Sequence, residues 1–273
     1  EFIQSHTSAP YGMAQVIHTD KSGSTAPSTA ITGGTFKNLC TRTTAWTVRA
    51  TNAAAGATKV SGGTFNKKIS DGYCADGFIP TKNADGTYGV IEYYPVEVWT
   101  GYTGTKVGSY HNIKEAAENL GDNKWIVVGS DYTLTEDFTI PTGVFLDVAK
   151  GVTLTVDEDV ILTVAADAKR LGVRNGATLV NDGTIMVCGT SRSNGAVMVQ
   201  DGAIFDTDTL TVPDGYILGN NGTNYYAAKP VFELTYSDGT VKQTDSSLPL
   251  DMSDVTKVTL LADVNDFASS ING

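Results

Sequence analysis

The same six-residue phrase occurs twice near the start of the chain. Residues 31–36 are Ile-Thr-Gly-Gly-Thr-Phe, and residues 60–65, which begin 29 positions later, are Val-Ser-Gly-Gly-Thr-Phe. Similarity at a fixed spacing is typical of repeat architectures, in which each unit buries its apolar face only by stacking on a neighbour. A β-branched residue, two glycines and Thr-Phe favour a tight corner that runs into a short strand. The repeat therefore predicts a β-solenoid in which Phe36 and Phe65 stack one coil apart.

Short apolar segments follow one another through the middle of the chain, separated by a few residues rich in Gly, Asp or Pro. Alternation within each segment places one apolar face inward. Successive solenoid coils suit this pattern better than a sandwich, because Asn-Gly and Asp-Gly corners recur and long Greek-key connections are missing. The expected strand segments are 125–128, 133–135, 138–140, 144–148, 152–156, 160–164, 177–187 and 196–205.

One segment, residues 109–121, departs from the β pattern. Its apolar residues recur at helical spacing between Ile113 and Leu120, and Gly121 follows as a C-cap. A helix with so narrow an apolar face suits a lid over the open end of a solenoid, where unpaired strand edges must be covered.

The fold predicted for the whole chain is all-β, a right-handed parallel β-helix with one short capping helix and a β-rich C-terminal segment. Residues 1–97 are expected to form N-terminal coils with the two GGTF phrases and a closing hairpin. Residues 98–123 are a linker with the capping helix, and residues 124–212 are a β-solenoid. Residues 213–273, with a hairpin at 231–241, are either a cap or an assembly element.

Charge limits the classes of partner. The formal net charge is −11 and the sequence pI is about 4.6, whereas binding to nucleic acid needs a basic surface. Nucleic acid and anionic membrane surfaces are therefore not expected as partners. No run approaches 18 apolar residues, so we expect no membrane insertion.

Three cysteines, Cys40, Cys74 and Cys188, contain no Cys-x-x-Cys pair. The favoured interpretation is that these cysteines are small apolar residues buried in the core of the solenoid. The alternative is one disulfide between Cys40 and Cys74, which would require the two 29-residue repeats to stack.

The chain carries no recognisable cofactor or metal motif. His6, His18 and His111 have no Cys, Glu or His at ligand spacing. A nucleophile elbow, a P-loop and a dinucleotide fingerprint are missing as well. We expect no cofactor and no metal.

Three groups of residues match a known family of proteins. They are the GGTF phrases with the Ala-Asp-Gly-Phe at 75–78, the helix and strands at 109–121, 126–131 and 134–141, and the strand at 258–264. On these residues the chain resembles the secreted, right-handed β-helix surface proteins of gut-dwelling Gram-positive bacteria, within the broad pectate-lyase-like superfamily. The resemblance implies a parallel β-helix at the bacterial cell surface, and it assigns no ligand.

The order of these phrases is reversed relative to the family, in which the helix comes first and the GGTF coils come last. The chain is therefore either a fragment of a longer repetitive surface protein or a subunit whose C-terminal segment completes the N-terminal coils of the next copy. Contacts of the second kind generate filaments, with strand addition at a sheet edge supplying the bonds. The residues expected in such an assembly are Val258, Leu260, Leu261 and Val264 at one end and Ile31 and Phe36 at the other.

The superfamily also contains polysaccharide lyases and hydrolases, which need clustered carboxylates around a glycosidic bond. The acidic groups of this chain are Asp157-Glu158-Asp159 and Asp131 with Glu136-Asp137. Both have the spacing of turns, so we interpret them as solvated corners and expect no catalytic residues.

A small basic stripe is the remaining candidate site. Lys169, Arg170 and Arg174, with Arg192 nearby, are placed to line one edge of consecutive coils. They are either plain surface charge or a site for an acidic glycan. The expected function is thus a non-enzymatic extracellular structural or adhesive protein whose partners are other copies or neighbouring repeats. The alternative is a β-helix that binds or degrades host or plant glycans, and a β-sandwich pilin is less favoured.

Overall fold

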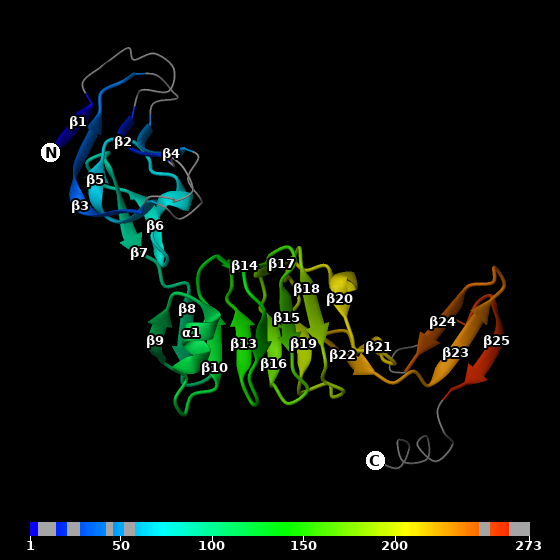
Figure 1. Ribbon diagram of the computed structural model, residues 1–273. Helices are drawn as coiled ribbons and strands as arrows, with labels where there is room; N and C mark the ends of the chain where they lie inside the picture. Colours follow the sequence, from blue (N-terminus) through cyan, green and yellow to red (C-terminus); the bar gives the residue numbers. More distant parts are fainter. Residues whose placement is uncertain (5–14, 21–27, 42–45, 52–57, 246–251, 262–273) are drawn as a thin grey trace. The chain divides into compact units, whose positions relative to one another are not determined.

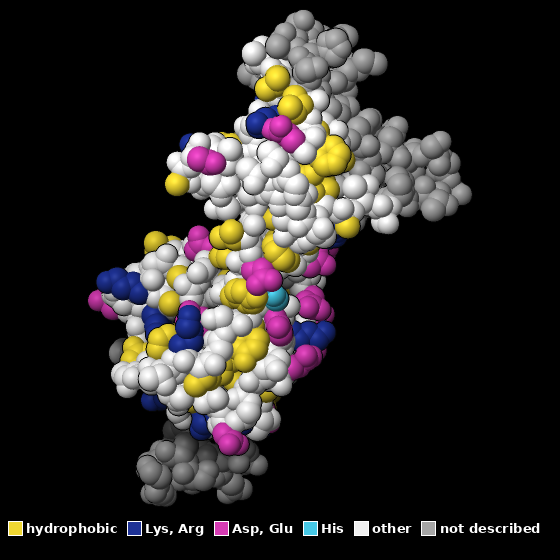
Figure 2. Space-filling view, turned by 90° about the vertical axis from the view of Figure 1, so that its left-hand side faces the viewer, with side chains coloured by type: hydrophobic (Ala, Val, Ile, Leu, Met, Phe, Trp, Pro, Cys, Tyr) yellow, Lys and Arg dark blue, Asp and Glu magenta, His cyan; other side chains and the backbone are white. Residues whose placement is uncertain are grey.

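A computed structural model describes residues 1–4, 15–20, 28–41, 46–51, 58–245 and 252–261. The chain divides into two compact units, Glu1–Tyr93 and Tyr94–Gly273, and each contains stacked parallel strands (Figure 1). The parallel stacked sheets form a β-solenoid of about seven turns, which confirms the predicted fold class. On the face drawn in Figure 2, Lys and Arg side chains occur in small groups among acidic ones.

The first unit is built from parallel strands that end in a hairpin. One sheet has the order β1-β3-β5-β7-β6, and β2 pairs with β4 in a second, parallel pair. The elements are β1 (Phe2–Gln4), β2 (Gln15–Asp20), β3 (Thr29–Asn38), β4 (Trp46–Thr51), β5 (Thr58–Phe65), a 3-10 turn (Asp71–Tyr73), β6 (Phe78–Lys82) and β7 (Tyr88–Glu92).

A ladder of phenylalanine rings runs through this unit. Phe36 and Phe65 occupy paired positions of β3 and β5, and their ring centroids lie 4.9 Å apart with planes 10° from parallel. The predicted stack is therefore confirmed. Phe2 adds a third ring, 5.1 Å from Phe36, which the sequence analysis missed because residues 1–4 lack the GGTF phrase.

Glycine is required at the corner next to the ladder. Gly63 has a φ of +112°, and a Cβ there would lie 3.0 Å from Cζ of Phe65.

Beyond the rings, the backbone N–H of Asn38 donates to Oδ1 of Asn66 over 2.8 Å, and Nδ2 of Asn66 donates back to the Asn38 carbonyl over 2.9 Å. This reciprocal pair satisfies the buried Asn38 and holds the two coils in one register.

The N-terminal edge differs from the expectation. Ile31 and Phe36 were predicted at an uncovered edge, but they are only 5% and 3% exposed. The reason is that β1 pairs in parallel with β3 and lays Phe2 over Phe36. The edge strand next to β3 is therefore β1, and β6 is the strand at the opposite edge.

The three cysteines are free thiols. Cys40 and Cys74 are buried in the first unit and Cys188 is half-buried in the second. Burial, with the charge of Asp71 as a smaller cause, raises the pKa of Cys74, and burial also raises the pKa of Cys188. Both remain protonated at neutral pH, as expected of packing residues.

The second unit is a solenoid with three sheets. Four successive coils contribute one strand each to the first sheet, and the residue offsets between them are 20, 25 and 26, from Trp125 to Phe145, Arg170 and Ala196. The first sheet contains β8 (Val96–Trp99), β9 (Lys106–Tyr110), β10 (Trp125–Val128), β13 (Phe145–Val148), β16 (Arg170–Val173), β19 (Ala196–Val199), β21 (Ile217–Asn220) and β22 (Asn224–Ala228). The second contains β11 (Tyr132–Leu134), β14 (Thr153–Val156) and β17 (Thr178–Asn181), and the third contains β12 (Phe138–Ile140), β15 (Ile161–Val164), β18 (Thr184–Val187) and β20 (Leu210–Thr211), which a 3-10 turn (Thr207–Thr209) precedes.

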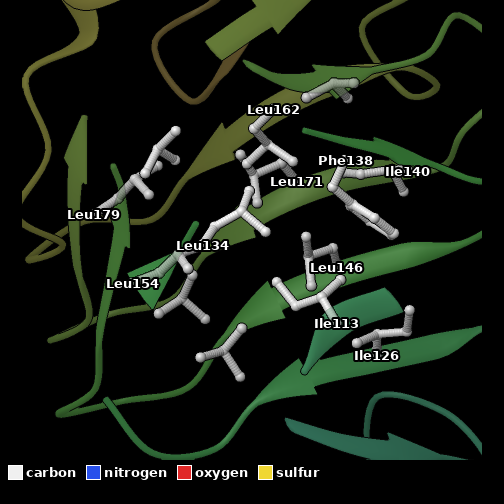
Figure 3. Packing of buried hydrophobic residues seen from close by; sticks show 14 of the residues in the cluster. Ile113, Ile126, Leu134, Phe138, Ile140, Leu146, Leu154, Leu162, Leu171 and Leu179 are labelled. Atoms are coloured by element: carbon white, nitrogen blue, oxygen red, sulfur yellow. The ribbon is translucent and has the colours of Figure 1, made fainter. Parts of the chain in front are cut away.

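The core of this unit consists of inward side chains stacked in register. Ile126, Leu146 and Leu171 occupy paired positions on three consecutive strands, and each is fully buried. Figure 3 shows them beside the leucines contributed by the other two sheets, such as Leu154 and Leu162. Burying each of these side chains stabilises the fold by about 1.5–3 kcal/mol.

The solenoid is covered at its first coil by the helix α1 (Ile113–Glu118), which buries Ile113 and Ala116. Asn112 caps the helix by accepting from the backbone N–H of Glu115 over 2.8 Å. The helix is shorter than the predicted 109–121 because residues 106–110 form β9. At the last coil, the hairpin β21–β22 pairs antiparallel with β19 and ends the parallel stack.

A separate antiparallel sheet follows, with strands β23 (Phe232–Tyr236), β24 (Val241–Thr244) and β25 (Val255–Leu260) in the order β24-β23-β25. The predicted hairpin at 231–241 is present. The strand expected at 257–264 begins at Val255 and pairs antiparallel with β23, so it does not open a new parallel coil. Val264 lies outside the described residues.

We predict that Phe65→Ala destabilises the first unit by about 3–5 kcal/mol, because the substitution opens a cavity in the middle of the ring ladder. Hydrogen exchange of the amides in β3, β5 and β6, followed by mass spectrometry, measures this loss locally. Ile91→Ala is the control: Ile91 is 49% exposed, and its replacement should change the free energy of unfolding by less than about 0.5 kcal/mol. Equal protection in both variants would contradict the ladder's role.

Candidate functional site

The outward positions of the first solenoid sheet carry an unusual row of side chains. Because side chains alternate along a strand, Phe145 and Asp147 face away from the core that Leu146 enters. The strand register places Phe145 between Trp125 of β10 and Arg170 of β16. Most outward positions of a solenoid are solvated, so a buried charge in this row needs an explanation.

Asp147 is fully buried and accepts hydrogen bonds from three side chains, those of Trp125, Arg170 and Arg174. Its Oδ2 accepts from Nη2 of Arg174 over 2.9 Å and from Nε1 of Trp125 over 3.0 Å. Its Oδ1 lies 3.4 Å from Nε of Arg170. These contacts compensate a buried carboxylate in a place where an isolated charge would be very costly.

Aromatic rings enclose the two guanidinium groups. The rings of Trp125 and Phe145 stack with centroids 3.8 Å apart and planes 7° from parallel. Cζ of Arg170 lies 5.2 Å from the Phe145 centroid, and Cζ of Arg174 lies 4.7 Å from that of Tyr102. Distances of this size allow cation–π attraction. We call the set Asp147, Arg170, Arg174, Tyr102, Trp125 and Phe145 the arginine cluster.

The cluster depends on a glycine in the next strand. Gly172 is paired with Asp147 in the register of β13 and β16, and a Cβ on it would overlap Oδ1 of Asp147. Any other residue there would displace the carboxylate from Arg170. Gly172 also weakened the strand pattern, which is why β16 was absent from the predicted strands.

The cluster has a positive excess charge at the surface. Two guanidinium groups face one carboxylate, and the side chains of Arg170 and Arg174 are 22% and 21% exposed. Each guanidinium has five N–H donors in a planar fork, and two from each lie toward Asp147. Three N–H donors of each guanidinium remain besides those two. Paired guanidinium donors of this kind are the groups with which proteins bind carboxylates and phosphates.

The four predicted basic residues do not form one stripe. The structure brings Arg170 and Arg174 together on Asp147. Lys169 instead donates to Oδ1 of Asn194 over 3.2 Å, and Arg192 lies over the ring of Tyr226 at 5.9 Å. The sequence analysis missed Asp147 itself. The available signal was an acidic residue inside the apolar segment 144–148.

The predicted acidic groups mainly hold corners of the coils. Oδ1 of Asp131 accepts from the backbone N–H of Thr153 in the next coil, and Oδ1 of Asp137 accepts from that of Ile161, each over 2.8 Å. In the other group, Oδ1 of Asp157 accepts a hydrogen bond from the backbone N–H of Glu158 in the same turn. Carboxylates that bind backbone N–H groups across coils have a structural role.

The remaining acidic residues are also accounted for by the surface and the turns. Glu136 lies 3.7 Å from Lys114 in an exposed ion pair. Glu158 is exposed, and Asp159 is exposed with a φ of +66°, a conformation that Asp tolerates in turns.

The residues expected in assembly are mostly exposed at the C-terminal end. Val258, Leu260 and Leu261 are 50%, 45% and 41% exposed. At the N-terminal end the exposed apolar residues are Phe2 and Ile3 of β1, at 58% and 52%, in place of the predicted Ile31 and Phe36.

Of the histidines, His111 stacks on Tyr94 with centroids 4.3 Å apart. His6 and the side chain of His18 lie outside the described residues. Within the described part of the chain, no three His, Cys, Asp or Glu side chains are grouped as metal ligands. No helix among the described residues is long and apolar enough to cross a membrane.

The chain matches no family model, and no curated protein or solved structure is significantly similar to it. Its function is therefore argued from the geometry of its own residues.

We predict that Asp147→Ala lowers the free energy of unfolding of the second unit by about 3 kcal/mol, because removing one partner of a buried ion pair leaves the others uncompensated. The partial exposure of both arginines places the value at the lower end of the range. Guanidinium denaturation followed by the fluorescence of Trp125, with Trp46 and Trp99 replaced by Phe in every protein compared, measures the change.

Glu158→Ala removes one exposed carboxylate from the same solenoid and is the matched control. It should leave the denaturation midpoint within error of the parent. If Asp147→Ala is equally silent, Asp147 does not organise the cluster.

Proposed function

We propose that the protein is a non-enzymatic, extracellular β-solenoid that serves as a structural or adhesive subunit and joins other copies, or neighbouring repeats, end to end. It would be a surface protein of the kind that its sequence resembles. The observation that carries the proposal is a pair of edge strands, β1 and β25, that both expose apolar side chains.

Edge strands with exposed apolar residues are sites of strand addition unless something blocks them. In the first unit, β1 is the last strand of its sheet, and Phe2 presents one ring face to Phe36 and is otherwise exposed. A further strand on β1 would continue the ring ladder. In the C-terminal sheet, β25 is also an edge, with Val258 and Leu260 exposed. Pairing of one copy's β25 with the next copy's β1 satisfies both edges.

The proposed lack of enzymatic activity is supported by the use of the acidic residues. Catalysis of glycoside hydrolysis needs two carboxylates facing a common substrate site. Asp131 and Asp137 are instead engaged with backbone N–H groups of the following coil, and Asp147 is engaged with two arginines. A structural role explains why these groups are spread along the stack.

We predict that assembly depends on one face at each end. Val258→Lys places a charge on the edge of β25 and should abolish filaments or oligomers seen by electron microscopy and light scattering. Phe2→Lys should do the same at β1. A 1:1 mixture of the two variants should form dimers, because each retains the end that the other has lost.

Val241→Lys is the matched control, since Val241 is 54% exposed on β24, the opposite edge of the same sheet. It should leave assembly unchanged. Mixed variants that stay monomeric, or a parent protein that is monomeric at all concentrations, would contradict end-to-end pairing.

We also predict that incubation with pectin, alginate, hyaluronan or xylan, with Ca²⁺ present, yields no new reducing ends and no unsaturated products. The physical reason is that Asp131 and Asp137 bind backbone N–H groups of the next coil and Asp147 binds two arginines. Turnover by the parent protein that is lost in the double variant Asp157→Asn and Asp159→Asn would instead establish a hydrolase or lyase.

A further inference from the structure

We propose that the arginine cluster is a binding site for a carboxylate-bearing sugar unit of an acidic glycan. This inference goes beyond the structural role proposed above and is independent of it, because the cluster lies on the outer face of the solenoid sheet and uses neither β1 nor β25.

The first step concerns the donors. Asp147 binds one edge of each guanidinium, and this buried carboxylate fixes the orientation of both groups before any ligand arrives. Arginine recognises carboxylates through paired N–H donors in a plane. Donors oriented in advance lose little side-chain entropy on binding. Two such groups with one internal countercharge leave a local charge of +1 for one external carboxylate.

The second step concerns the rings. Tyr102 is 48% exposed, Arg174 lies over its ring, and Trp125 is 5.8 Å from it, centroid to centroid. A pyranose ring presents apolar C–H groups beside its substituents, and an exposed aromatic surface next to the arginines can contact them. An inorganic anion would use the donors and leave the aromatic surface without a role. A sugar that carries a carboxylate uses both.

The third step concerns charge density. The chain has a net charge of −11, and on the face drawn in Figure 2 basic side chains are scattered in small groups. A densely charged polymer such as nucleic acid would be repelled beyond the cluster. A glycan with one carboxylate per disaccharide presents its charges about 10 Å apart, which exceeds the screening length of about 8 Å at physiological salt. One carboxylate can then bind while the others are screened.

The test uses the full chain and two probes, a hyaluronan tetrasaccharide and chitotetraose, which share N-acetylglucosamine units and differ in the carboxylates. Titration calorimetry and the fluorescence of Trp125, with Trp46 and Trp99 replaced by Phe, should detect binding of the first probe only. Arg174→Gln should weaken it at least tenfold, while Asp147 keeps its pair with Arg170.

The matched controls are Arg192→Gln and Lys169→Gln, which remove the same charge from nearby coils and should leave the affinity within twofold of the parent. Tyr102→Ala separates the two parts of the site. It should weaken binding of the tetrasaccharide at least fivefold and leave binding of inorganic sulfate unchanged. Circular dichroism and the denaturation midpoint establish that each variant is folded.

Several outcomes would overturn the proposal. Chitotetraose binding as tightly as the hyaluronan probe would show that the site does not recognise the carboxylate. Sulfate or a tetraglutamate peptide binding as tightly as the tetrasaccharide would assign the cluster to anions or acidic peptides in general. Equal affinity in Arg174→Gln and Arg192→Gln, or no binding of the hyaluronan probe at millimolar concentration, would show that the arginines serve only the stability of the solenoid.

Discussion

The stacked coils of both units depend on one constraint, the parallel stacking of equivalent residues from one coil to the next. A single coil cannot bury its apolar face, so stability comes from repetition. In the first unit the constraint is met by stacked phenylalanines and by an asparagine pair that locks the register. In the second unit it is met by aliphatic side chains from three sheets, with Leu146 and Leu171 at the centre. The same register also arranges the outer face, and this places Trp125, Phe145 and Arg170 in one row.

The arginine cluster differs from these apolar stacks because it buries a charged side chain. Burying Asp147 needs two arginines, an indole donor and a glycine in the neighbouring strand, all contributed by the register. Replacing a buried ion pair by apolar residues is often neutral or stabilising. A ladder of aromatic or aliphatic residues would therefore have served the fold at least as well. The charged residues in this row are the groups that the proposed glycan site would use.

Much of the fold could be predicted from sequence because repetition is a local signal. The GGTF phrases led directly to the stack of Phe36 on Phe65, and alternation in segments such as 152–156 located strands correctly. The failures have physical causes. Strand β16 begins with Arg170 and contains Gly172, so its pattern is polar and weak, although its neighbours determine its conformation. Phe2 and β1 lack the repeated phrase and are recognisable only by what they cover.

Only part of the candidate site could be predicted from the sequence, and the reason is related. Arg170 and Arg174 were singled out as basic residues, but Lys169 and Arg192 were grouped with them. The carboxylate that separates the first pair from the second lies a whole coil earlier in the chain, at Asp147. Pairings over this distance follow from the number of residues in each coil, and that number varies between neighbouring coils.

This variation in coil length has a consequence for how such a chain can change. The offsets of 20, 25 and 26 residues between consecutive strands of the first sheet differ by up to six residues, yet the core side chains of Ile126, Leu146, Leu171 and Val197 remain paired. Most of the extra residues are accommodated at the corners, where lengthening a loop costs little because closure entropy grows only slowly with length. Corners are thus free to gain or lose residues during evolution while the core stays the same. Residues in the corner loops can therefore be replaced, and new side chains can be presented at the surface, while the stacked core keeps its structure.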